Sequence, residues 1–170
     1  MSNIATARLP VLAVLALALA LALGACAKNT AEGDGINGAG YGAGGSGPGS
    51  LQEFAASVGD RVFFDTDQTD LNAQGEATLA KQAEWLNRYG RYNFTIEGHA
   101  DERGTREYNF ALSSRRAESV KNYLVAHGVA AARMRTISYG KERPVATCDD
   151  ISCWSQNRRA VTLLNGAAGS

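Results

Sequence analysis

The chain has 170 residues, of which 45% are hydrophobic, and its 17 basic side chains balance its 17 acidic ones. This composition is typical of one globular domain with extensions, and it excludes a wholly disordered chain and a basic protein that coats polyanions. We therefore expect no nucleic-acid partner.

An apolar segment rich in Leu, Ala and Val runs from Leu9 to Leu23, behind the single basic residue Arg8. It is short for a membrane span and has the length of the core of a secretory signal. It ends in Leu23-Gly24-Ala25-Cys26, which resembles a bacterial lipobox, whose Cys receives a diacylglycerol. We expect residues 1–25 to be a lipoprotein signal peptide and Cys26 to be lipidated; the alternative is an ordinary cleaved signal with an incidental Cys.

Several acyl chains on one Cys attach a protein stably to a membrane. Residue 27 is Ala and not the Asp that retains many such lipoproteins at the inner membrane, so the pattern favours the outer membrane, with the protein facing the periplasm. More than half of residues 33–49 are Gly, a composition with nothing to bury. We expect residues 26–50 to form a flexible tether with a typical reach of about 25–30 Å.

Ordered structure is predicted from Ser50, where Ser-Leu-Gln-Glu reads as a capping box for a short helix that Gly59 ends. The β-branched and aromatic residues 61–64 predict a strand. Asn72 is a candidate N-cap for a helix that runs to about Tyr89 and stops at Gly90.

Alternation of apolar and polar residues predicts a second strand over 92–98, followed by a polar loop over 99–104. A long helix is expected from about Thr105 to His127, with Gly128 after its end. Two more strands are predicted, and they cover residues 134–139 and 159–164. The fold class is therefore α/β (α+β): a single domain over 51–165 with a mixed four-stranded sheet and two long helices on one face, then a disordered tail over 166–170.

Three Cys are present, and Cys148 and Cys153 lie close together in the sequence. In an oxidising periplasm we expect these two to form a disulfide, which would constrain the unfolded chain by about 2 kcal/mol. Two free thiols are the alternative. A metal site is not expected, because neither Cys has a His nearby and the chain has only two His. No cofactor is expected either.

Arg116 is out of place on the second long helix. Helical periodicity puts it, with Asn109, inside the arc of about 140° that should face the core, whereas the adjacent Arg115 points to solvent. A buried guanidinium needs a partner. That partner is either an internal carboxylate such as Asp101 or Asp67, or the carboxylate of a ligand clamped by the planar guanidinium.

Several sequence segments resemble the OmpA-like peptidoglycan-binding domains, and most closely those of the lipoproteins of the Tol–Pal system. They are Gly98-His99-Ala100-Asp101-Glu102-Arg103-Gly104-Thr105, Glu107-Tyr108-Asn109, the pattern from Leu112 through Arg116 to Val120, Ser138 to Glu142, and Asn157 to Val161. The likeness spans about residues 60–165, and it follows a lipobox and a tether in the same order. Arg106 replaces a common Pro, and the Cys148/Cys153 pair is absent from many relatives.

The resemblance implies a protein without enzymatic activity that binds diaminopimelate in the peptidoglycan stem peptide, anchors the outer membrane to the wall and acts in envelope integrity and constriction during cell division. It implies that Arg116 binds a carboxylate and that Asp101 binds the amino group or the adjacent backbone. The other residues implied at the pocket are Thr66, Asp67, Ala100, Asn109 and Leu112. The implied partners are peptidoglycan, membrane lipid through acylated Cys26, and Tol proteins, notably TolB.

Without the resemblance, the residues alone are compatible with two other functions. His99, Asp101 and Glu102 lie together at a strand end, where acid–base groups often gather, but no catalytic motif accompanies them, and His99 is expected to hydrogen-bond the backbone. The second alternative is a structural lipoprotein that binds only proteins, with Arg116 locked in an internal ion pair.

Overall fold

The computed structural model describes residues 47–165. The predicted signal peptide, Cys26, most of the tether and the tail over 166–170 lie outside the described residues. Within 47–165, no helix is both long enough and apolar enough to cross a bilayer.

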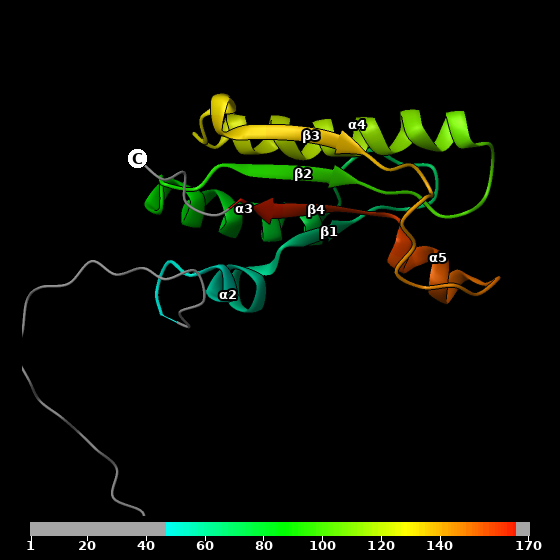
Figure 1. The fold of residues 1–170 in the computed structure, drawn as a ribbon, viewed down its shortest axis with the longest axis horizontal. Helices are drawn as coiled ribbons and strands as arrows, with labels where there is room; N and C mark the ends of the chain where they lie inside the picture. Colours follow the sequence, from blue (N-terminus) through cyan, green and yellow to red (C-terminus); the bar gives the residue numbers. More distant parts are fainter. Residues whose placement is uncertain (1–46, 166–170) are drawn as a thin grey trace, which may run out of the picture. The chain divides into compact units, whose positions relative to one another are not determined.

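Four strands form one sheet in the order β1-β4-β2-β3, as Figure 1 shows. Their bounds are Arg61–Phe63 for β1, Phe94–Gly98 for β2, Met134–Ser138 for β3 and Arg159–Leu164 for β4. β2 and β3 pair in parallel, whereas β4 runs antiparallel to both β1 and β2. The predicted mixed four-stranded sheet is confirmed.

The two long helices, α3 (Ala73–Arg88) and α4 (Arg106–Ala126), lie on the same face of the sheet (Figure 1). The shorter elements are α2 (Leu51–Glu53), a π-helical turn over Phe54–Gly59, a 3₁₀ turn over Ala131–Arg133, and α5 (Ile151–Asn157). Between the sheet and the long helices lies the apolar core, built on the fully buried side chains of Leu79, Leu86, Phe94, Ile96 and Leu124.

Three predicted helix starts are confirmed by side-chain caps. Ser50 accepts from the backbone N–H of Glu53, Asn72 from that of Gly75 and Thr105 from that of Tyr108, at 3.1, 2.8 and 3.2 Å. Gly128 has a φ of 87°, the left-handed conformation expected after a helix end. Helix boundaries were readable because capping is a local interaction.

The connection before β4 contains a helix that the sequence did not predict. α5 begins after Asp150, whose carboxylate accepts from the N–H of Ser152 at 2.7 Å. A helix of two turns is too short to show an amphipathic stripe, so periodicity gave no signal. The folded part also starts earlier than expected, because the carbonyl of Gly49 accepts from the Tyr92 hydroxyl at 2.6 Å.

β2 and α4 touch backbone to backbone at Gly98. A Cβ placed on Gly98 would lie 1.8 Å from the carbonyl oxygen of Ser113, in the middle of α4. Only a residue without a side chain allows this approach. The contact sets how closely the N-terminal half of α4 approaches the end of the sheet.

We predict that Gly98→Ala destabilises the fold by about 3 kcal/mol, because the new methyl group must push α4 away from β2. Urea unfolding measures the change. Gly90→Ala is the matched control, since a Cβ at Gly90 meets nothing within 4 Å. Equal stability of the two variants would show that α4 does not need this close approach.

Candidate functional site

β1 and β2 finish and α4 begins at the same end of the sheet (Figure 1), and residues at this end line a cavity of about 270 Å³. Its walls come from the loop after β1, the loop after β2, α4 and the residue before β4. The lining residues are Thr66, Asp67, Asp101, Arg103, Gly104, Tyr108, Asn109, Leu112, Arg116 and Arg158. Six of the seven predicted ligand-binding residues are among them.

Arg116 is 0% exposed, as its helical position predicted, but no carboxylate holds it. Its Nε donates to the carbonyl of Gln68 at 2.9 Å, Nη1 to that of His99 at 3.0 Å, and Nη2 to that of Asp65 at 3.1 Å. Of the two alternatives left open by the sequence, the internal ion pair with Asp101 or Asp67 is therefore excluded. The sequence could not show this arrangement, because backbone carbonyls are present at every residue.

The guanidinium keeps its charge in this site. Burial, and then the nearby charge of Arg158, lower the pKa of Arg116 to about 10, which still leaves it protonated at neutral pH. The guanidinium also lies 5.1 Å from the centre of the Phe64 ring. The cavity therefore has a fixed positive charge in its wall.

Asp101 is the acidic centre of the cavity. Its carboxylate accepts from Nη2 of Arg103 at 2.7 Å and from Nη1 of Arg158 at 3.4 Å. Burial raises the pKa of Asp101, but the hydrogen bonds from Arg103 and Arg158 outweigh it, and the pKa lies below its ordinary value. Asp101 is thus ionised and already paired.

The remaining predicted residues take different places. Asn109 is buried and donates from Nδ2 to the carbonyl of Arg103 at 2.7 Å. Asp67 has a φ of 63° and accepts from the Tyr108 hydroxyl. Thr66 and Leu112 line the cavity. Ala100 does not, which corrects its expected place in the wall: it is buried, and its N–H donates to the carbonyl of Gly140 at 2.8 Å.

Four lining residues were not proposed as site residues from the sequence: Arg103, Gly104, Tyr108 and Arg158. Arg103 had a local signal, since a residue two positions after an Asp often donates its N–H to that carboxylate, and Arg103 does so to Asp101 at 3.2 Å. Arg158 had none. It reaches the cavity only because β4 runs between β1 and β2.

His99 lies beside the cavity and not in its lining. Both of its ring nitrogens are buried without a hydrogen-bond partner, so the expected bond to the backbone is wrong. The ring stacks on Tyr139, 5.6 Å between centres, and the carboxylate of Glu97 is 3.6 Å away, too far for a hydrogen bond. Burial, then the charges of Arg159 and Arg143, lower the pKa of His99 to about 4.

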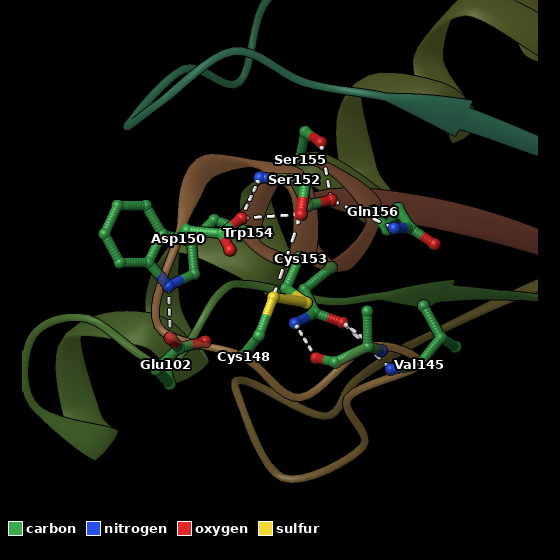
Figure 2. The surroundings of a disulfide bond; sticks show 11 residues. Glu102, Val145, Cys148, Asp150, Ser152, Cys153, Trp154, Ser155 and Gln156 are labelled. Atoms are coloured by element: carbon green, nitrogen blue, oxygen red, sulfur yellow. Dashed lines mark hydrogen bonds between the residues drawn. A yellow bond between two sulfur atoms is a disulfide. The ribbon is translucent and has the colours of Figure 1, made fainter.

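The predicted disulfide is present, since the structure joins Cys148 and Cys153 (Figure 2). Residues 47–165 contain no group of three or more His, Cys, Asp or Glu side chains placed to hold a metal ion.

Residues 63–158 match the sequence model of the OmpA family. A peptidoglycan-associated lipoprotein of Rhizobium meliloti is 68% identical over 120 residues, which cover 71% of this chain and 68% of the relative. One from Pseudomonas aeruginosa is 48% identical over 112 residues, which cover 65% of this chain and 66% of the relative. The family and these relatives are not enzymes, so the prediction of a non-catalytic protein is confirmed.

Solved structures of two other proteins have the same fold. The crystal structure of the peptidoglycan-associated lipoprotein from Burkholderia pseudomallei has a TM-score of 0.63 at 40% identity, with 65% of this chain and 96% of that chain covered. The C-terminal domain of MotB from Helicobacter pylori has a TM-score of 0.59 at 21% identity, covering 64% of this chain and 86% of that one, which is a likeness of fold alone.

We predict that Arg116→Ala lowers the free energy of unfolding by about 3 kcal/mol or more, because it leaves the carbonyls of Asp65, Gln68 and His99 without their donor. Arg115→Ala, on the exposed side of the same helix, should change it by less than about 0.5 kcal/mol. Chemical denaturation of both variants measures the difference. Equal effects would contradict the assigned role.

A second prediction concerns acid stability. The pKa of His99 in the folded protein, about 4, lies below its ordinary value of 6.5, so between these pH values only the unfolded chain binds this proton. Stability is therefore lost as pH falls from 6.5 to 4, by about 3 kcal/mol for this group.

His99→Phe is the control, because it keeps a flat ring against Tyr139 and cannot titrate. Urea unfolding at pH 7 and pH 4 should show a smaller loss in the variant than in the wild type. The other titrating groups are common to both proteins, so identical losses would exclude His99 as the cause.

Proposed function

The chain belongs to the OmpA family and, within it, to the peptidoglycan-associated lipoproteins, and from this membership and the cavity we propose that its folded part binds the peptidoglycan stem peptide noncovalently. The ligand group is the free end of diaminopimelate, which carries one ammonium and one carboxylate. The single observation that supports this best is a cavity whose wall holds fixed charges of both signs.

The two charges of the ligand match two parts of the lining. The acidic part consists of Asp67 and Asp101, which suit the ammonium, and the basic part consists of Arg103, Arg116 and Arg158. Because all five side chains are fixed by protein contacts before the ligand arrives, little side-chain entropy is lost on binding.

The role of Arg116 differs from that of a free clamp. A guanidinium has five N–H groups, and Arg116 uses three of them on backbone carbonyls. One N–H on Nη1 and one on Nη2 have no partner among residues 47–165, and this side chain lines the cavity. In the proposal these two N–H groups donate to the ligand carboxylate, while the hydrogen bonds to backbone carbonyls hold the guanidinium in place.

The proposal extends to the whole envelope. Acyl chains on Cys26 hold one end of the protein in the outer membrane, residues 26–50 supply reach, and the domain over 51–165 binds the wall. We further propose that Tol proteins, notably TolB, compete for the same face during envelope constriction in cell division. No covalent step is needed at either end apart from lipidation.

The rival function is a lipoprotein that binds only proteins, with Arg116 serving only the fold. The buried guanidinium fits that rival as well, because three carbonyls already hold it. The cavity beside it, lined by charges of both signs, favours a ligand. Direct binding distinguishes the two functions.

We predict that the purified full chain sediments with diaminopimelate-type peptidoglycan, and that Asp101→Asn weakens this binding about tenfold, because the ligand ammonium loses its charged acceptor. Asp70→Asn, an exposed change in the loop after β1 and outside the cavity lining, should bind as the wild type does. Circular dichroism confirms that each variant is folded.

A wall with Lys in place of diaminopimelate should also bind more weakly, because Lys lacks the second carboxylate. That comparison uses the unaltered protein and is free of folding effects. Failure of the wild type to bind either wall would exclude the proposed function.

A further inference from the structure

α5 lies beside the cavity and is tied down at several points. The disulfide joins Cys148 in the preceding loop to Cys153 within the helix, and Asp150 caps its start (Figure 2). At its other end, the buried Asn157 accepts from the N–H of Val145 at 2.9 Å and donates to the carbonyl of Ala146 at 2.8 Å. The helix and its preceding loop therefore form one braced unit.

Trp154 connects this unit to the loop after β2, whose residues Asp101, Arg103 and Gly104 line the cavity. Figure 2 shows its indole N–H directed at the carboxylate of Glu102, with which it makes a hydrogen bond. The guanidinium carbon of Arg103 lies over the same ring, 4.2 Å from its centre. Two adjacent residues of the loop after β2 are thus held by one side chain.

Arg103 is the most accessible of the three arginines that line the cavity. Its side chain is 40% exposed, compared with 8% for Arg158, whereas Arg116 is buried completely. Nε and Nη2 of Arg103 donate to Asp101, and Nη2 also reaches Thr66 at 3.4 Å. Nη1 makes no hydrogen bond to any residue between 47 and 165, so one edge of this fixed guanidinium is available.

We propose that Trp154 is a positioning residue of the cavity: it holds Arg103 so that the free Nη1 edge can bind a carboxylate of the ligand. The carboxylate is a second one, supplied by a neighbouring residue of the stem peptide. This inference rests on the proposed function and adds to it a specificity-determining contact.

Two physical effects follow from the indole. A long side chain that is already ordered loses less entropy on binding, and stacking on an aromatic ring orders Arg103. The bond to Glu102 has a separate effect, because it keeps this carboxylate occupied. Without it, Glu102 would be free to approach the adjacent Arg103 and compete with the ligand carboxylate.

The test is a titration of the purified full chain with the soluble tripeptide L-Ala-γ-D-Glu-meso-diaminopimelate, followed by calorimetry. Arg103→Gln should lower affinity about tenfold or more, through loss of a charged hydrogen bond. Trp154→Ala should lower it by about threefold to tenfold, as expected for one side chain that must be ordered anew. Trp154→Phe, which keeps a ring but not the N–H, should fall between Trp154→Ala and the wild type.

The double variant Arg103→Gln/Trp154→Ala separates positioning from general structural support. If Trp154 acts through Arg103, the double variant should bind no more weakly than Arg103→Gln alone. Ile151→Ala is the matched control, since Ile151 is exposed on the same helix and is not in the cavity lining. It should bind as the wild type does.

Additive losses in the double variant, or wild-type affinity of Trp154→Ala, would overturn the positioning role. Wild-type affinity of Arg103→Gln would overturn the second carboxylate contact. Both results leave the proposed function intact as long as the wild-type protein binds the tripeptide. Absence of wild-type binding would instead contradict the proposed function itself.

Discussion

The cavity depends on one buried cation that is satisfied by backbone. The side chain of Arg116 projects from α4 and donates to carbonyls in two separate loops. These are the carbonyls of Asp65 and Gln68 after β1 and that of His99 after β2. Arg cannot lose its proton at neutral pH, so these loops must keep their carbonyls turned toward it or leave a charge unpaired in the interior. The conformation of both cavity walls is thereby coupled to one side chain.

The backbone contacts leave the acidic residues available for other interactions. Asp101 pairs with Arg103 and Arg158 and not with Arg116, so positive and negative groups share one lining. In the proposed function, this site takes a small group with both charges, such as the end of a diaminopimelate side chain, and the spacing of those charges sets its selectivity.

The close approach at Gly98 and the braced α5 place the parts of this site. Gly98 lets the backbone of β2 reach that of Ser113, which brings the start of α4 and its polar residues to the end of the sheet. α5 brings an indole against Glu102 and Arg103 on the outer side of the same loop. The disulfide contributes at a distance, because it fixes the helix that carries Trp154.

The sequence alone determined most secondary-structure elements and the unusual core-facing position of Arg116. Caps at Ser50, Asn72 and Thr105 act on neighbouring N–H groups, and apolar periodicity is also local, so the helices before β3, the strands and the burial of Arg116 were predictable, whereas α5 was not. Only the tertiary structure decided which side chains contact one another. Arg158 meets Asp101, Trp154 meets Arg103, and His99 is left without a hydrogen bond, because these contacts depend on strand order and on a short helix without a periodic pattern. Carbonyl oxygens, which hold Arg116, are identical at every position of a chain and become specific only when folding brings them together.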